Sequence, residues 1–271
     1  MILITGDKGF VGLHMDIPHV GYDLVDGFDI LDTYQLETVF ANNHIDTVIH
    51  LAALAGVHKS LLFPDKYIDV NIKGTQNIID ACKRHNVKHL IFFSSSSVYG
   101  NGKPPLQETN ELNPISPYGI SKVAGELLVK SSGVPYTIIR PFSLYGDKGR
   151  KDQIFYKWIN EIKAHGEITL LGDGTAQRGF TNVYDLVDAV KLILHKGAEN
   201  ETYNIGGSEI ITMNDVIKTL ENNYAFYVNK LPENNGDIYQ SWADISKARD
   251  KLGYEPKRNF FEELQVIINN I

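Results

Sequence analysis

Short apolar runs alternate with longer amphipathic segments through the first half of the chain, and this alternation constrains the fold more than any other feature. Short apolar runs bounded by glycine or polar residues are typical of buried strands, whereas longer segments with one polar face are typical of helices. Strands are expected at Met1–Thr5, Tyr22–Val25, Thr47–Leu51, His89–Phe93 and Tyr136–Arg140. Helices are expected as a short segment after the first strand and at Thr33–Asn42, Asp65–His85 and Ser116–Ser131. The alternation predicts an α/β fold, a doubly wound sheet of parallel strands with right-handed crossovers.

A glycine-rich turn follows the first strand, with Gly6, Gly9 and Gly12 at G-x-x-G-x-x-G spacing. Such glycines let backbone N–H groups and the N-terminus of the next helix approach a pyrophosphate. The second strand is expected to end in Asp26, an acid that can accept a hydrogen bond from a ribose 2′-hydroxyl, which favours NAD over NADP. The segment from Gly12 to Asp26 is short and Pro18 interrupts it. We therefore expect a very short first helix and a lowered NAD affinity.

A serine-rich segment and a Tyr–Lys pair supply the candidate catalytic groups. The strand His89–Phe93 runs into Ser94–Ser97, where side chains at a strand end can face a cleft and hold a substrate hydroxyl. Tyr118 and Lys122 are four residues apart on an expected helix and share one of its faces. Positive charge near a phenol lowers its pKa, so the pair can act as a base, although many solvated helix faces carry a Tyr and a Lys at this spacing.

Charge and composition exclude several classes of function. The net charge of −7 argues against nucleic acid or an anionic membrane as the main partner, while a local basic site can still bind a phosphorylated substrate. The one cysteine, Cys82, cannot form an internal disulfide. The nine histidines lack convincing ligand spacing, so we expect no metal. The opening apolar run is too short for a signal peptide and no membrane span is visible, so a cytoplasmic location follows by default.

Beyond Tyr145 the strands shorten and the loops lengthen, which predicts a smaller second lobe. Glycine-, asparagine- and proline-rich stretches lie at Gly146–Gly149, Gly172–Gly174 and Pro232–Gly236. We expect one domain over residues 1–150 that binds the nucleotide cofactor. The remainder, 151–271, is expected to form mainly a lobe that caps the carboxyl edge of the sheet, with segments around 175–205 returning to the first domain.

Three motifs occur together in one order: the glycine turn Thr5–Gly12, the serine-rich segment Ser94–Gly100 and the pair in Tyr118–Lys122. Further matching segments are His50–Val57, Asn71–Thr75, Arg178–Asp185, Tyr203–Gly207, Trp242–Lys247 and Leu252–Pro256. Almost from end to end, the chain resembles the extended short-chain dehydrogenase/reductases, the NAD-dependent nucleotide-sugar epimerase and dehydratase family. The resemblance implies a Rossmann sheet with a smaller C-terminal substrate-binding lobe, a tightly held NAD, a nucleoside-diphosphate sugar substrate, and redox chemistry at a sugar carbon.

The resemblance assigns roles around the cofactor. Tyr118 would be the general base, and Lys122 would bind the nicotinamide ribose and lower the pKa of that tyrosine. The other matching cofactor residues are Gly6, Gly9 and Gly12 with Phe10 and Val11 at the pyrophosphate, Asp26 at the adenosine ribose, Asp29 and Ile30 at the adenine edge, Leu51, Ala52 and Ala53 along the dinucleotide, and Phe142 near the nicotinamide. Asp29 can equally serve as a turn or cap residue.

The resemblance also assigns roles on the substrate side. Ser95 matches the hydroxyl that hydrogen-bonds the reacting sugar oxygen. Arg178 matches a diphosphate-binding arginine, for which a surface ion pair is the competing interpretation, and Asp237 matches a ribose-binding carboxylate. The chain departs from the family pattern at two places. Gly179 replaces the usual acid after Arg178, and asparagines at 234–235 stand where many relatives have a further diphosphate-binding arginine.

The residues after the catalytic serine narrow the reaction. Dehydratases of this family carry acidic residues there to eliminate water, whereas this chain has Ser96 and Ser97, which disfavours dehydration and decarboxylation. The serine run and the following segment look most like 4-epimerases acting on UDP-uronic acids, in which a hydroxyl matching Ser143 and an arginine matching Arg150 hold the sugar carboxylate. A guanidinium suits that role because its planar fork can bind a carboxylate through two hydrogen bonds. An exposed arginine in a glycine-rich loop is the competing interpretation.

The expected reaction is 4-epimerisation of UDP-glucuronate or UDP-galacturonate through a 4-keto sugar, with Tyr118 taking the O4 proton as hydride passes to NAD⁺. Three alternatives stay open. They are a UDP-glucose/UDP-galactose 4-epimerase, a 4-ketosugar reductase that consumes reduced nicotinamide, and a nucleotide-sensing scaffold without turnover. Family resemblance further implies a homodimer packed through the helices around Asp65–His85 and Ser116–Ser131.

Overall fold

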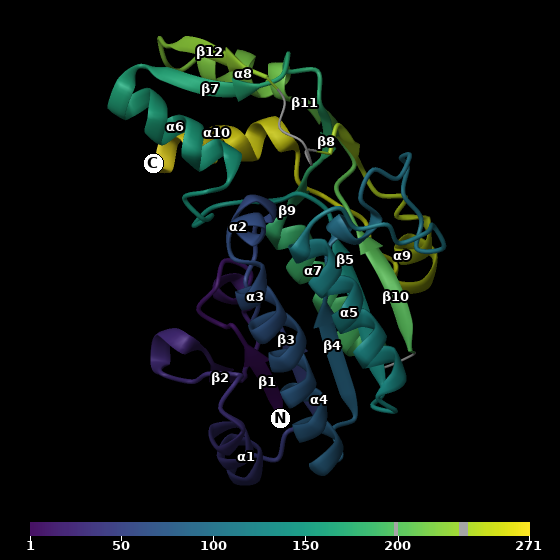
Figure 1. The fold of residues 1–271 in the computed structure, drawn as a ribbon. Helices are drawn as coiled ribbons and strands as arrows, with labels where there is room; N and C mark the ends of the chain where they lie inside the picture. Colours follow the sequence, from purple (N-terminus) through teal and green to yellow (C-terminus); the bar gives the residue numbers. More distant parts are fainter. Residues whose placement is uncertain (198–199, 233–237) are drawn as a thin grey trace.

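A six-stranded parallel sheet forms the centre of the molecule in a computed structural model that describes residues 1–197, 200–232 and 238–271. The strand order is β10-β5-β4-β3-β1-β2 (Figure 1). The strands are β1 (Ile2–Thr5), β2 (Val20–Tyr22), β3 (Thr47–His50), β4 (His89–Phe93), β5 (Tyr136–Pro141) and β10 (Glu201–Ile205). The predicted doubly wound α/β fold is confirmed.

Helices cover both faces of the sheet because successive side chains of a buried strand point to opposite sides. One face packs against α1 (Thr33–Asn42), α4 (Gly74–Arg84) and α5 (Pro117–Ser131). The other packs against α7 (Val183–Lys196) and α9 (Ser246–Leu252). The strand residues in the first core include Leu3, Val48 and Leu90, and those in the second include their neighbours Ile4, Ile49 and Ile91. Each central strand therefore contributes to two separate hydrophobic cores.

The segment that joins β1 to β2 departs from the sequence-based expectation. Only a single 3-10 turn, η1 (Gly12–His14), follows the glycine turn where a short helix was expected. Strand β2 ends at Tyr22 rather than at Val25, and a second 3-10 turn, η2 (Leu24–Asp26), follows it. This turn forms because the Asp23 side chain accepts a hydrogen bond from Val25 N and Gly27 adopts φ 84°, a left-handed conformation that glycine adopts readily. The chain therefore leaves the sheet one turn earlier than predicted.

The helix expected over Asp65–His85 is not continuous. It consists of α3 (Pro64–Tyr67), a π-helical segment η3 (Ile68–Lys73) and then α4, and α2 (Val57–Leu62) precedes it. The wider π turn carries Asn71, whose side chain accepts from Leu54 N at 2.8 Å and donates to Leu54 O at 3.0 Å. Such π segments frequently occur at functional sites. Here it fixes the loop that follows β3.

A smaller lobe lies beyond the carboxyl ends of β3 and β4 (Figure 1). Its elements are α6 (Ile154–His165), β7 (Glu167–Leu171), β8 (Gln177–Gly179), β11 (Ile210–Thr212), α8 (Met213–Glu221), β12 (Tyr227–Leu231), β13 (Gln240–Ser241) and α10 (Phe260–Asn270). Its core contains Phe155, Trp158, Phe180 and Phe260. The short pair β6 (Leu144–Tyr145) and β9 (Thr181–Asn182) joins the two lobes. Among the described residues, no helix combines the length and apolarity needed to cross a membrane.

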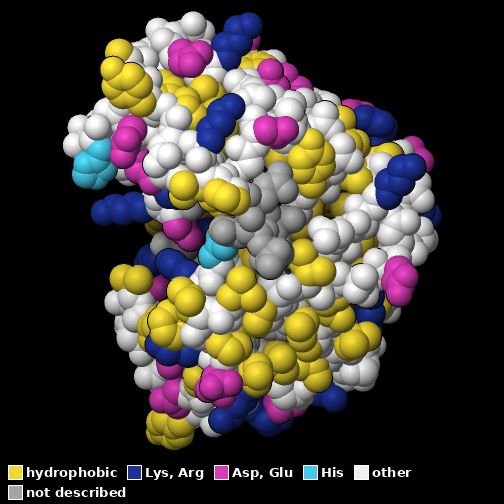
Figure 2. Space-filling view, turned by 45° about the horizontal axis from the view of Figure 1, so that its top comes forward, with side chains coloured by type: hydrophobic (Ala, Val, Ile, Leu, Met, Phe, Trp, Pro, Cys, Tyr) yellow, Lys and Arg dark blue, Asp and Glu magenta, His cyan; other side chains and the backbone are white. Residues whose placement is uncertain are grey.

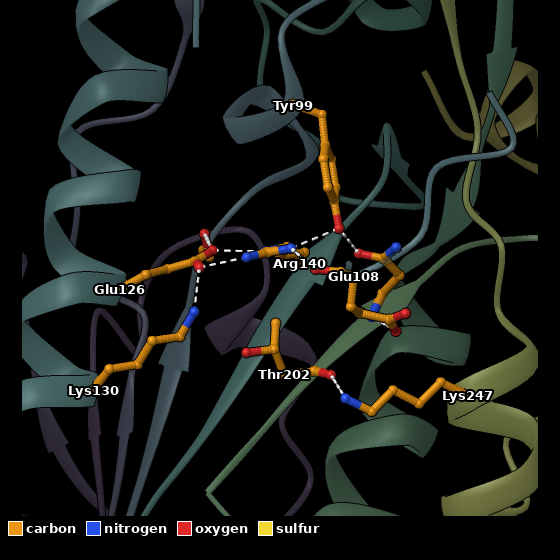
Figure 3. A network of polar contacts seen from close by, with 9 residues as sticks. Tyr99, Glu108, Glu126, Lys130, Arg140, Thr202 and Lys247 are labelled. Atoms are coloured by element: carbon orange, nitrogen blue, oxygen red, sulfur yellow. Dashed lines mark hydrogen bonds and ion pairs between the residues drawn. The ribbon is translucent and has the colours of Figure 1, made fainter. Parts of the chain in front are cut away.

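A buried charge network ties α5 to the neighbouring strands (Figure 3). Arg140 of β5 donates to the Glu126 carboxylate of α5 at 2.8 and 2.6 Å and to the Tyr99 hydroxyl at 2.7 Å. Tyr99 in turn donates to Asn204 of β10, and Ser94 donates to Glu126 at 2.6 Å. A paired and hydrogen-bonded buried charge is costly to move. The network therefore holds α5 in register with the end of β4, where the serines begin.

Candidate active site

A cleft at the carboxyl ends of β1, β3 and β4 brings together most of the residues predicted to contact the cofactor. It is lined by Gly6, Gly9, Phe10, Val11, Gly12, Leu51, Ala53, Ala55, Phe93, Ser94, Tyr118, Lys122, Pro141, Leu144 and Arg150. An added Cβ at Gly6 would lie 2.7 Å from Ala52 N, and one at Gly12 would lie 2.5 Å from Asp7 O, so only glycine allows the turn to follow this path. A glycine-rich wall opposite Tyr118 and Lys122 fits a dinucleotide, with the pyrophosphate at the turn.

Five predicted cofactor residues do not line this cleft, and one of them, Ala52, packs against the core beneath it. Asp26 lies in η2, with its carboxylate 3.7 Å from Lys8 Nζ, and Asp29 closes a turn by accepting from Leu31 N at 2.9 Å. Ile30 is buried in the core under α1 and α4. Phe142 is fully buried with its ring against Tyr99, so the residues that face the cleft at this point are Pro141 and Leu144.

Asp23, rather than Asp26, is the acid at the carboxyl end of β2. The pairing of Thr5 with Tyr22 places Asp23 directly after the strand, beside the glycine turn. Its Oδ2 accepts from Lys8 N at 3.0 Å, so Asp23 contacts the turn itself. The sequence prediction missed it because the strand was extended to Val25. Asp23 could have been found only by knowing that β2 ends at Tyr22. The pairing of β2 with β1 determines that end.

Tyr118 and Ser95, two of the three predicted catalytic residues, lie next to each other, and Tyr118 lines the cleft. Tyr118 is the second residue of α5, whose N-cap Ser116 accepts from Gly119 N at 3.1 Å, and Ser95 caps the 3-10 turn η4 (Ser96–Tyr99). Burial raises the pKa of the Tyr118 phenol, while a hydrogen bond with Ser95 and the charge of Arg150 oppose this shift. The influences that lower this pKa come from Ser95 and Arg150, and the effect assigned to Lys122 stays a prediction.

Lys122 lies deeper than the phenol. Its Nζ donates to Phe93 O at 2.8 Å and lies 5.9 Å from the centre of the Tyr118 ring. Burial lowers the pKa of Lys122 to about 8, against the opposing charge of Glu126 one turn along α5. The side chain of Lys122 also lines the cleft.

Two residues outside the predicted set hold the loop after β3 over the cleft. The Tyr67 hydroxyl donates to the carbonyls of Ala55 and Gly56 at 2.9 and 3.0 Å, and its ring meets Tyr118 edge-on at 6.2 Å. Asn71 anchors Leu54 and also donates to Ser121 Oγ at 3.0 Å. These contacts fix the cofactor wall relative to α5. In the sequence, Asn71 begins one of the segments that match the family, Asn71–Thr75, but the resemblance assigned no role to it.

A second hollow adjoins the cofactor cleft and is lined by hydroxyl groups. Ser96, Ser97, Ser116, Ser143 and Ser241 contribute to it, together with Val57, His58, Ile115, Arg178 and Ile238. Three serines predicted to contact the substrate, Ser96, Ser97 and Ser143, lie together here, whereas Arg150, which was predicted to act with Ser143, lines the cofactor cleft. Several hydroxyls around one cavity can exchange hydrogen bonds with the hydroxyls of a sugar.

A third hollow lies between the second one and the core of the smaller lobe. Its walls are Asp152, Ile154, Lys157, Trp158, Thr169, Leu170, Leu171, Ala176, Met213 and Tyr239, and it shares His58, Arg178 and Ile238 with the hydroxyl-lined hollow. Arg178 donates to the carbonyls of Gln177, Ile238 and Tyr239. His58 was not predicted, although it closely follows the cofactor motif His50–Val57. Asp237 lies outside the described residues. The more apolar third hollow suits a nucleoside and the hydroxyl-lined hollow suits a sugar. The side chains of His58 and Arg178, which both hollows share, suit the diphosphate between them.

Arg150 lies in the loop after β6, on the side of the cleft that faces Tyr118. Its Nε donates to Asp152 at 2.9 Å, and Lys59 of α2 lies 3.9 Å from the same carboxylate. Arg150 lines the cofactor cleft, whereas Ser143 lines the hydroxyl-lined hollow. In Figure 2 the molecule is hollowed between its two lobes, with basic and acidic side chains at the edge of the hollow.

Known proteins share this architecture along almost the whole chain. Residues 19–206 match the model of the NAD dependent epimerase/dehydratase family. A UDP-glucuronate 4-epimerase from Thermodesulfobacterium geofontis is 36% identical over 89% of this chain and 77% of its own. The structure of a UDP-glucuronic acid 4-epimerase from Bacillus cereus, with UDP-glucuronic acid and NAD, has a TM-score of 0.90 at 30% identity and covers 99% of both chains. A UDP-glucose 4-epimerase from Thermotoga maritima, with UDP-glucose, has a TM-score of 0.92 at 28% identity, covering 99% of this chain and 97% of its own.

Proposed function

The chain belongs to the NAD-dependent epimerase/dehydratase family, and from this premise we propose that it interconverts UDP-glucuronate and UDP-galacturonate by inverting the sugar at C4. The observation that carries the proposal is the position of Arg150, which lines the same cleft as Tyr118 and acts on its phenol electrostatically. A guanidinium in the same cleft can bind a sugar carboxylate while C4 faces the phenol.

Tyr118 is the proposed acid and base at O4. Its phenolate accepts the O4 proton as the sugar is oxidised and returns the proton after the 4-keto sugar has turned over. Bound NAD⁺ supplies the hydride acceptor and donor for this oxidation and reduction. Ser95 hydrogen-bonds both the phenol and O4, and so keeps the two oxygens within proton-transfer distance. Lys122 holds the nicotinamide ribose, and we propose Asp23 rather than Asp26 for the adenosine ribose.

Binding of the sugar carboxylate by Arg150 would prevent a side reaction of the 4-keto sugar. A 4-keto hexuronate is a β-keto acid, which loses CO₂ when its carboxylate is free to align with the ketone. In the proposal, Arg150 holds that carboxylate through charge-assisted hydrogen bonds, and Ser96, Ser97 and Ser143 hold the ring hydroxyls. Asp152, which now accepts from Arg150, would be displaced by the substrate. Arg178 and His58 would face the diphosphate.

A UDP-glucose/UDP-galactose 4-epimerase is the second candidate. The ion pair of Arg150 with Asp152 favours it, because a guanidinium already paired with a carboxylate has no need of a second one. Both candidates share the base, the cofactor and the nucleotide. They differ only in whether Arg150 contributes to transition-state binding.

The test compares four purified proteins on UDP-glucuronate and on UDP-glucose, with the product configuration read by NMR. Arg150→Ala is expected to lose about 10- to 100-fold in kcat/KM on the uronate, the range expected for charge-assisted hydrogen bonds, and to keep its activity on the hexose. Lys151→Ala, which removes a neighbouring exposed charge, should match the parent on both substrates. Tyr118→Phe should be inactive on both. Full uronate activity in Arg150→Ala would refute the carboxylate role.

A further inference from the structure

A buried histidine connects the cofactor turn to the loop that carries Arg150. His14 is the last residue of η1, and its Nδ1 lies 2.8 Å from Phe10 O in the glycine turn. Its Nε2 lies 3.0 Å from Asp147 Oδ1, and the His14 side chain is only 3% exposed. Both partners are oxygen acceptors, so the two hydrogen bonds form together only when both ring nitrogens carry a proton. The contact with Asp147 is then charge-assisted.

Aromatic contacts hold the imidazole in this position. The Phe10 ring meets it edge-on at 5.5 Å, and the Tyr184 ring meets it edge-on from α7 at 5.1 Å. Tyr184 also interacts with Asp147 through its hydroxyl. The imidazole cannot swing away from either hydrogen bond without losing packing on both sides. His14 is therefore a fixed link between two parts of the site.

The two parts that it links belong to different ligands. Phe10 lines the cofactor cleft from the glycine turn, whereas Asp147 is three residues before Arg150 in the loop after β6. Any shift of the turn moves Phe10 O and, through His14, the position of Asp147. A shift of that loop changes where the Arg150 guanidinium lies relative to Tyr118.

We propose that His14 and Asp147 are positioning residues that couple occupancy of the cofactor site to binding of the substrate carboxylate by Arg150. This inference rests on the function proposed above. Bound cofactor holds the turn, the turn holds His14, and His14 holds the Arg150 loop closed over the sugar. By thermodynamic reciprocity, a substrate that engages Arg150 must tighten cofactor binding by the same factor.

The experiment measures NAD dissociation constants by calorimetry in saturating UDP or saturating UDP-glucuronate. UDP lacks the sugar acid and cannot engage Arg150. The parent is expected to bind NAD about fivefold or more tightly with UDP-glucuronate than with UDP. In Asp147→Ala this ratio should fall to about one. Asp147→Asn, which can keep the hydrogen bond without the charge, should be intermediate.

Asp16→Ala is the matched control. Asp16 lies on the same segment just after η1 and pairs with Lys191 of α7 at 2.7 Å, so its loss loosens the segment without touching the Arg150 loop. This variant should keep the parental ratio. An unchanged ratio in Asp147→Ala, or a parental ratio of one, would overturn the coupling. If UDP-glucose tightens NAD binding as much as UDP-glucuronate and Asp147→Ala removes the effect, the link is supported and the uronate assignment of Arg150 is wrong.

Discussion

Burial controls the protonation of several residues around the cleft, and His50 is the strongest case. His50 ends β3, and its ring nitrogens face Thr5 Oγ1 at 2.7 Å and Thr75 Oγ1 at 3.1 Å. Burial, with a further contribution from the charge of Lys122, lowers the pKa of His50 from 6.5 to about 3. The neutral ring is thus part of the folded structure, joining the first strand to the helix that follows the π segment.

The buried His50 predicts a specific loss of stability in acid. Below pH 6.5 the unfolded chain protonates this histidine, whereas the folded chain does not until about pH 3, so the free energy of unfolding falls as the pH decreases between these values. At pH 5 the loss from this one group should be about 2 kcal/mol relative to pH 7.5. Urea unfolding at the two pH values measures it.

The matched variants for this prediction are His50→Asn and His44→Asn. His50→Asn should be less stable than the parent at pH 7.5, since its shorter side chain loses a hydrogen bond, but should lose less stability on acidification. His44 is exposed, and its replacement should leave the pH dependence unchanged. A parental pH dependence in His50→Asn would show that this histidine is not the buried group responsible.

At the scale of elements, the connection from β1 to β2 decides how the cofactor is held. An α-helix after a glycine turn directs aligned N–H groups at a pyrophosphate, whereas η1 spans only Gly12–His14. The turn also contains Asp7, which is 5% exposed, and its Oδ1 lacks a hydrogen-bond partner among the described residues. A carboxylate in the turn opposes the charge of a bound pyrophosphate, although Lys8 Nζ lies 3.2 Å from it.

We therefore predict that NAD exchanges readily, in contrast to the tightly held cofactor implied by the family resemblance. The purified protein should lose NAD on gel filtration and regain activity when NAD is added. Asp7→Asn should tighten NAD binding by about three- to tenfold, because it removes a like charge near the pyrophosphate. Asp250→Asn, at an exposed position on α9, is the control for net charge. Copurification of NAD with the parent, or unchanged affinity in Asp7→Asn, would contradict this.

The strands of the central sheet differ in how accurately the sequence predicted their ends. Strands β3, β4 and β5 were predicted to within a residue at each end, because apolar residues on both faces leave little choice of structure. The end of β2 was missed because Leu24 and Val25 continue the apolar pattern, although the side chain of Asp23 closes a turn there. The boundary between the domains at residue 150 stays a prediction.

The site shows the same division. Tyr118 and Lys122 line the cleft and Ser95 lies beside Tyr118, positions that helix periodicity and a strand end indicated, while their catalytic roles stay a prediction. The side-chain direction of Phe142 could not be predicted. At the end of β5, neighbouring residues point alternately into the cleft and into the core, so an error of one residue reverses the prediction. The contact of His14 with Asp147 joins residues that are distant in the sequence, and no local pattern indicates it.

At the scale of the whole molecule, several large hydrophobic side chains are exposed on neighbouring helical segments. Figure 2 shows hydrophobic side chains gathered over the lower part of the molecule. Exposed residues on α2, η3 and α5 include Leu62 at 72%, Ile68 at 55%, Ile120 at 53% and Leu127 at 59%. Ile120 and Leu127 are two helical turns apart and share one face of α5. Exposed apolar side chains on elements that pack against one another favour a two-fold symmetric interface with a second copy.

The predicted homodimer can be tested through α5 itself. Ile120→Glu/Leu127→Glu should convert a dimer into a monomer in light scattering after size exclusion, because two charges per chain would be buried against their symmetry copies. Since Tyr118 lies on the same helix, activity should fall together with dimer content and recover at high protein concentration. Tyr227→Glu, at an 82% exposed position on β12, is the control and should stay dimeric. A monomeric parent would remove the basis for this interface and leave the apolar face of α5 without a partner copy.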